Sequence, residues 1–132
     1  MPAMTLFHPH AQAADGSKLK EAVDRCIFHL KGIKDDFDII AVRGASGMVV
    51  GSIVAWEMGK RLMVIRKDNE HVHMFASYSM YGTPIPHRTV FLDDFIESGR
   101  TYNSVVRILG EHPKWVMLYD TDRLYRPDPR AL

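Results

Sequence analysis

The sequence predicts an α/β protein whose central sheet is mainly parallel and is covered by helices on both faces. Short apolar segments of the strand type alternate with helical patterns along the 132 residues, which is typical of this fold class. The segments at 38–42 and 62–65 are almost continuously apolar, as expected of parallel strands buried on both sides. Glycine-rich or charged loops directly follow three of the strands. We therefore expect right-handed crossovers and a ligand cleft at the carboxyl ends of the strands.

The composition argues against binding to nucleic acid or to a membrane. The 17 basic and 16 acidic side chains are interspersed and give a net charge of +1, without a polybasic stretch. The apolar runs are too short to span a membrane, and the first residues show no signal-peptide pattern. Cys26 is the only cysteine and cannot form an internal disulfide, which fits the reducing cytoplasm. We expect one cytoplasmic domain, residues 1–132, that binds small molecules.

The two ends of the sequence are expected to lie outside the regular elements. Residues 1–15 show no period and are expected to form a lead-in segment. Residues 123–132 contain two prolines and are expected to form a C-terminal tail after a last strand at 115–119. His8 and His10 offer two metal-type ligands, but without further ligands nearby exposed histidines are the simpler interpretation.

The first helix is predicted over residues 18–31. Ser17 is placed to cap its N-terminus, and Gly32 is placed to end it. Apolar residues recur at helical spacing on one face, with charged residues opposite. The residues of this apolar face are Leu19, Ala22, Val23, Cys26, Ile27 and Leu30. The helix is therefore expected to pack this face on the sheet.

A glycine-rich loop at residues 43–47 follows the strand at 38–42 and precedes an apolar helix at 48–58. Its arginine offers a planar fork of donors to phosphate oxygens, and its glycines permit close approach of the backbone. The glycine spacing also fits a dinucleotide-binding turn. No acid ends the following strand, however, and the chain is short for a second mononucleotide-binding half. The loop is therefore predicted to hold phosphate groups.

Two cations, Arg66 and Lys67, follow the strand at 62–65 and are expected at the ligand-binding edge. Beyond them, His71 and His73 alternate with an apolar residue, as in an exposed strand. The two histidines share a strand face and suit a metal or a diphosphate, although surface histidines are the simpler interpretation.

The richest pattern in the chain lies between residues 89 and 109. A strand at 89–92 ends in the carboxylates of Asp93 and Asp94, and the small-residue loop 97–101 then opens a helix. Backbone N–H groups at a helix start can hold a phosphate dianion, with hydroxyls of the loop as further donors. The carboxylates can accept hydrogen bonds from sugar hydroxyls or hold a hard cation such as Mg²⁺. Together these features suit a phosphorylated sugar.

The segment Phe91-Leu92-Asp93-Asp94-Phe95-Ile96-Glu97-Ser98-Gly99-Arg100-Thr101 closely resembles the phosphoribosyl diphosphate (PRPP) binding motif of type I phosphoribosyltransferases. The resemblance implies a three-layer phosphoribosyltransferase-like fold. It also implies that Asp93 and Asp94 contact the ribose hydroxyls and hold Mg²⁺ directly or through water. Glu97 takes the place of the acid near the reacting base. The 5′-phosphate is then bound by Ser98, Gly99, Arg100 and Thr101.

The first glycine-rich loop resembles the pyrophosphate loop of the same family. Val42-Arg43-Gly44, together with the later cation pair, is most similar to the adenine-type members. The implied pyrophosphate ligands are Arg43, Gly44, Ala45, Ser46, Arg66 and Lys67. The chain departs from the family in having no lysine or arginine between Lys67 and Arg88, where the family's mobile loop often presents a cation. It also has short flanks, where the family usually adds a hood that forms the base pocket.

By this resemblance the protein is expected to transfer the phosphoribosyl group of PRPP-Mg²⁺ to a nitrogen acceptor, a nucleobase, with release of pyrophosphate. Family members are often homodimers, and the aromatic-rich segment 75–81 is a candidate interface. The alternative is a PRPP- or nucleotide-binding regulatory or partner-binding domain without catalysis. Glu97 and Arg43 favour the enzyme, whereas the cation-free loop and the short flanks favour the binding domain.

Overall fold

The structure is a computed structural model that describes residues 16–65, 72–75, 85–96, 99–128 and 130. It contains a six-stranded sheet with the strand order β3-β2-β1-β4-β5-β6. The strands are β1 (Ile39–Arg43), β2 (Arg61–Ile65), β3 (Val72–Phe75), β4 (Thr89–Asp93), β5 (Trp115–Leu118) and β6 (Arg123–Tyr125). The helices are α1 (Gly16–Leu30), α2 (Ala45–Met58) and α3 (Arg100–Leu109), with short 3₁₀ helices η3 (Lys31–Asp36) and η4 (Pro86–Arg88).

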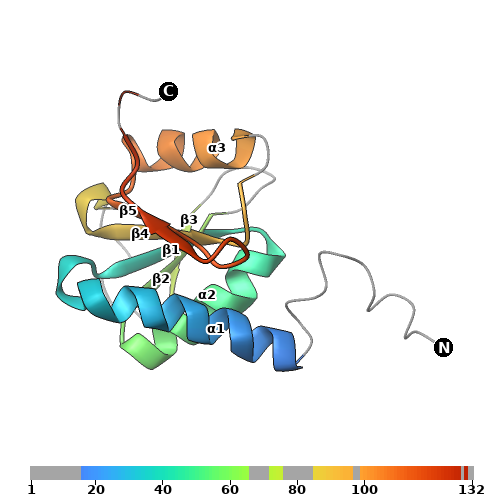
Figure 1. The fold of residues 1–132 in the computed structure, drawn as a ribbon. Helices are drawn as coiled ribbons and strands as arrows, with labels where there is room; N and C mark the ends of the chain where they lie inside the picture. Colours follow the sequence, from blue (N-terminus) through green and yellow to red (C-terminus); the bar gives the residue numbers. More distant parts are fainter. Residues whose placement is uncertain (1–15, 66–71, 76–84, 97–98, 129, 131–132) are drawn as a thin grey trace.

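The sheet is parallel at its centre and antiparallel at both margins. β1 pairs in parallel with β2 and β4, and β4 pairs in parallel with β5. β3 and β6 each run antiparallel to their neighbours. α1 and α2 cover one face of the sheet and α3 covers the other, so the protein has three layers (Figure 1). The predicted fold class is confirmed.

Strand β1 lies between two separate hydrophobic clusters. Ile40 and Val42 pack with the buried residues of α1 and α2. Ile39 and Ala41 point to the opposite face and pack with the buried residues of α3. Because successive side chains of a strand alternate between faces, a strand covered on both sides must be apolar throughout. No helix in the described part of the chain is long and apolar enough to cross a membrane.

Polar contacts close the amino edge of the sheet. Arg88 donates to both carboxylate oxygens of Asp38 over 2.9 and 3.0 Å, and these bonds lower the pKa of Asp38. Asp36 accepts bonds from Lys114 Nζ (3.0 Å) and Trp115 Nε1 (3.1 Å). The charged groups at this edge therefore satisfy one another.

Most boundaries shift by one or two residues from those expected, so that α1 begins at Gly16 and Ser17 lies inside it, and two boundaries shift further. The second helix begins at Ala45, so residues 45–47, predicted as loop, form its first turn. Gly44 precedes it with φ 91°, and that backbone conformation places the turn immediately after β1. The first α-helix ends at Leu30, but the chain continues as η3 through Asp36 instead of stopping at Gly32.

The prediction of a tail over residues 123–132 is wrong in its first part. Arg123–Tyr125 forms β6, which pairs antiparallel with β5. The turn between them includes Asp122 with φ 52°, a left-handed conformation that aspartate tolerates better than most residues. A three-residue edge strand is stabilised mainly by the strand beside it, so the local sequence carried no clear signal for it.

Helix α2 lies close to β1 and β4 because two of its residues are glycines. A Cβ atom at Gly51 would lie 2.4 Å from Val42 Cγ1, and one at Gly47 would lie 3.1 Å from the carbonyl oxygen of Leu92. Real Cβ atoms essentially never come within 3.0 Å of such neighbours, and 3.1 Å is tighter than nine in ten real contacts. Gly51 is therefore required for the position of α2, and Gly47 allows its first turn to approach β4 without displacing a neighbour.

We expect Gly51→Ala to lower the free energy of unfolding by about 1–3 kcal/mol, because the added methyl group overpacks the buried contact with Val42. Chemical denaturation measures the change. Gly32→Ala is the matched control, because no atom lies within 4 Å of its added Cβ. If Gly51→Ala is as stable as this control, the close approach does not determine the packing of α2.

Candidate functional site

The predicted site residues that the structure describes gather at the carboxyl edge of β1, β4 and β5. Ala41 pairs with Phe91, so Arg43 and Asp93 each lie two residues further along parallel neighbours. Asp93 in turn pairs with Leu118 near the end of β5. Because these strands run in the same direction, their carboxyl ends meet at one edge. Loops that are about fifty residues apart in the sequence thus become neighbours.

Two helices begin at this edge without side-chain caps. α2 begins after Gly44 and α3 after Gly99, both glycines having positive φ. Neither first turn contains an acidic residue. The intrahelical bonds start with Met48 N–H to Gly44 O (3.0 Å) and Asn103 N–H to Gly99 O (2.8 Å). The preceding N–H groups of each helix have no intrahelical acceptor, and together with the helix dipole they favour an anion.

The carboxylates of Asp93 and Asp94 lie between the two helix starts in the sequence and are held by the backbone. Asp93 Oδ1 accepts a bond from the N–H of Asp94 (2.9 Å), and Asp94 Oδ1 accepts one from the N–H of Phe95 (2.8 Å). A Cβ atom at Gly47 would lie 3.6 Å from Asp93 Oδ1, so the first turn of α2 reaches this acid. The acidic pair and the first turn of α2 therefore lie next to each other.

The turn after β5 brings a third carboxylate to the edge. The N–H of Tyr119 donates to Asp93 O (3.1 Å), and the N–H of Asp120 donates to Asp94 O (3.0 Å). Burial raises the pKa of Asp120, and the negative charge of Asp94 raises it further. The sequence did not lead us to assign Asp120 to the site. The available signal was its position directly after the strand expected at 115–119, the same position that Asp93 occupies after the strand expected at 89–92.

Two buried polar atoms near this edge have no hydrogen-bond partner among the residues that the structure describes. They are Nε of Arg43 and the hydroxyl of Tyr119. Tyr119 is only 3% exposed, and burial together with the charge of Asp94 raises its hydroxyl pKa. A buried polar group without a partner costs about 1–3 kcal/mol. Such groups are uncommon in folded proteins, and a pair at a ligand-binding edge is typical of a site that is completed by its ligand.

Several predicted site residues lie outside the described part of the chain. These are Glu97, Ser98, Arg66 and Lys67, together with His8, His10 and His71. The side chain of His73, on β3, is also not described. Their roles stay predictions. Within the described ranges, no group of three or more His, Cys, Asp or Glu side chains is arranged to hold a metal ion.

Solved structures share this fold. Adenine phosphoribosyltransferase from Thermoanaerobacter pseudethanolicus superposes with a TM-score of 0.58 at 17% identity, covering 82% of this chain and 70% of that one. Purine phosphoribosyltransferase from Pyrococcus horikoshii superposes with a TM-score of 0.54 at 20% identity, covering 72% and 64%. The fold is therefore similar to that of phosphoribosyltransferases.

Sequence relatives agree with the fold. Adenine phosphoribosyltransferase of Desulforamulus reducens is 29% identical over 108 residues, which cover 72% of this chain and 62% of the relative. The enzyme of the same name from Thermotoga petrophila is 27% identical over 104 residues, covering 68% and 59%. No protein-family model matches the chain. In both fold and sequence the chain is thus similar to type I phosphoribosyltransferases of the adenine type. It spans about three fifths of the length of these relatives.

We expect Tyr119→Phe to leave the free energy of unfolding unchanged or to raise it by up to about 1 kcal/mol, because it removes a buried hydroxyl that has no partner. Tyr102→Phe is the matched control. The Tyr102 hydroxyl is hydrogen bonded to His112 Nδ1 at 2.6 Å, so its loss is expected to cost about 1–3 kcal/mol. Urea denaturation of both variants gives the comparison. Equal destabilisation by the two substitutions would show that the Tyr119 hydroxyl is satisfied in the folded protein.

Proposed function

We propose that the protein binds PRPP with Mg²⁺ and transfers the phosphoribosyl group to a ring nitrogen of a purine base, releasing pyrophosphate. The observation that carries the proposal is the arrangement of two uncapped helix N-termini with the Asp93–Asp94 pair at one sheet edge. PRPP carries a phosphate at one end, a diphosphate at the other and a hydroxylated ribose between them. The adenine-type similarity of the chain favours a purine acceptor.

The two anionic groups of PRPP are assigned to the two helix starts. The 5′-phosphate is bound at the start of α3 by the N–H groups of its first turn, with Ser98 and Thr101 hydroxyls as further donors. The diphosphate is bound at the start of α2, where Arg43 lies beside the amides of residues 44–46, and Arg66 and Lys67 complete this set. Arg43 has a buried Nε without a partner, as expected of a donor reserved for a ligand.

The acidic pair is assigned to the ribose. Asp93 and Asp94 accept hydrogen bonds from the vicinal sugar hydroxyls. In the reaction the base nitrogen forms a bond to the anomeric carbon while the bond from that carbon to the pyrophosphate oxygen breaks. Positive charge develops on the ribose, and the nearby carboxylates stabilise it. Glu97 accepts or orients the proton of the attacking nitrogen.

The donor set fits Mg²⁺ that is bound mainly by its substrate. Mg²⁺ prefers six oxygen ligands and usually keeps waters and phosphate oxygens among them, so one or two carboxylates suffice. Asp93 and Asp94 are hard oxygen donors of this kind, and one oxygen of each is oriented by a backbone N–H. When bound, the ion neutralises charge on the diphosphate that leaves.

A second candidate function is a PRPP- or nucleotide-binding regulatory domain. It is favoured by the absence of any lysine or arginine between Lys67 and Arg88 in the sequence. Such a domain keeps the phosphate loops but lacks the cation that helps to hold the departing diphosphate.

Calorimetric titration with PRPP-Mg²⁺ tests the binding site that both functions share. We expect Arg43→Met to weaken binding about 10- to 100-fold, because a charge-assisted bond contributes about 1.5–3 kcal/mol. Arg61→Met is the control, because Arg61 begins β2 at the opposite edge of the sheet. Equal affinities for Arg43→Met and the unmodified protein would contradict the assigned diphosphate site.

Pyrophosphate release, screened across nucleobases, separates the enzyme from the binding domain. We expect Asp94→Asn to lower turnover by at least about tenfold without changing the unfolding midpoint, since the charge it removes stabilises the transition state. Binding of PRPP without release for any base would select the regulatory domain. Unchanged turnover in Asp94→Asn would remove this residue from the reaction.

A further inference from the structure

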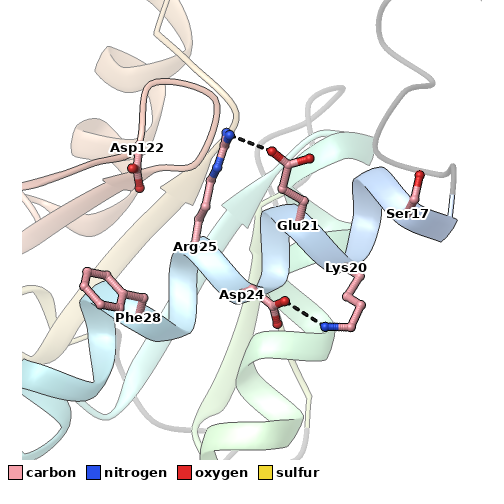
Figure 2. Close-up of a pocket in the computed structure, with 7 residues that line it drawn as sticks. All are labelled: Ser17, Lys20, Glu21, Asp24, Arg25, Phe28 and Asp122. Atoms are coloured by element: carbon pink, nitrogen blue, oxygen red, sulfur yellow. Dashed lines mark hydrogen bonds and ion pairs between the residues drawn. The ribbon is translucent and has the colours of Figure 1, made fainter.

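Arg25 connects helix α1 to the turn that follows β5. Its Nη1 donates to the carbonyl oxygen of Tyr119 over 3.1 Å, and its Nη2 donates to Glu21 Oε1 over 2.7 Å. Figure 2 shows the guanidinium reaching from α1 toward this turn, with Glu21 beside it. The side chain is 39% exposed, so it lies partly in the interface between the helix and the turn.

The contact of Arg25 continues directly into the acidic edge. The carbonyl of Tyr119 accepts from Arg25, and the N–H of the same residue donates to Asp93 O. The next N–H, that of Asp120, donates to Asp94 O. Both backbone groups of Tyr119 are thus used, one toward α1 and one toward β4. A movement of Arg25 would therefore shift Tyr119, and the N–H groups of Tyr119 and Asp120 bond directly to the backbone of the acidic pair.

A second tie between α1 and the same turn provides an internal comparison. His29 Nε2 lies 2.8 Å from Asp122 Oδ1, two residues beyond Asp120. This tie holds the far end of the turn, where the chain enters β6. Arg25, in contrast, bonds to the residue next to the carboxylates. Either contact can stabilise the packing of α1 on the turn, but only Arg25 bonds to a residue that is itself bonded to the acidic pair.

We propose that Arg25 is a positioning residue for the carboxyl-edge site: it holds the turn after β5 against Asp93 and Asp94. The site residues bind the ligand, and Arg25 acts on the ligand through them. The identity of that ligand rests on the proposed function, but the placement of the turn does not.

A first experiment measures the placement of the turn without any ligand. Amide hydrogen exchange of Tyr119 and Asp120 is followed by NMR in the full chain, because these N–H groups donate to Asp93 O and Asp94 O. We expect Arg25→Met to speed exchange at both amides at least about threefold, because the turn loses its bond to α1, and Arg25→Lys to speed it less. Lys20→Met is the control, since Lys20 is a cation of the same helix that pairs with Asp24. Unchanged exchange at both amides in folded Arg25→Met would overturn the positioning role.

A second experiment measures the effect on the ligand. In calorimetry with PRPP-Mg²⁺ we expect Arg25→Met to weaken binding at least about fivefold. We expect Arg25→Lys to weaken it only about twofold, because lysine keeps the positive charge but cannot donate to both Tyr119 O and Glu21 as the guanidinium does. If Arg25→Met does not fold, Arg25→Lys provides the test of binding.

The control is His29→Ala, which is expected to bind PRPP-Mg²⁺ as the unmodified protein does. Wild-type affinity in both Arg25 variants would refute the positioning role. Failure of the unmodified protein to bind PRPP would instead refute the proposed function and leave the NMR result to decide the role of Arg25.

Discussion

Parallel pairing of β1 with β4 is the constraint on which the site depends. It brings Arg43 and Asp93 to neighbouring positions, because each lies two residues beyond the Ala41–Phe91 pair. It also directs both following helices to start from the same edge, where their dipoles reinforce one another toward an anion. The close packing of α2 through its glycines fixes how near its first turn comes to the acid. Without this pairing the same residues would form two unrelated loops.

The two edges of the sheet differ in how their polar groups are satisfied. At the amino edge, carboxylates and cations bind one another, and the bonds from Arg88 lower the pKa of Asp38. At the carboxyl edge, the pKa of Asp120 is raised, and the Arg43 Nε and the Tyr119 hydroxyl are buried without partners among the described residues. His112 Nε2, which precedes β5 at the amino edge, is also buried without a partner there, so unpaired buried atoms do not separate the two edges. The raised pKa of Asp120 and the two helix starts distinguish the carboxyl edge.

The carboxyl edge carries both acidic and anion-binding groups, and these groups come from different elements. The acids follow β4 and β5, while Arg43 and the helix starts supply the positive potential. Arg25 adds a cation from α1 on the outer side of the acids. A ligand with anionic ends and a hydroxylated centre matches this alternation, and PRPP has that form.

The sequence alone determined the fold class, the sheet direction and the loops at its carboxyl edge, because these follow from local periodicity and from which residues come after each strand. It also predicted Asp93 and Asp94 from a contiguous motif and Arg43 from a separate glycine-rich loop, and their roles stay predictions. It did not reveal β6, the position of Asp120 beside Asp94, or the contact of Arg25 with Tyr119, which spans 94 residues. Those features arise only when separate segments are brought together, because an edge strand and a helix-to-turn bond derive their stability from partners distant in the chain. Tertiary structure therefore decided how the acidic edge is held.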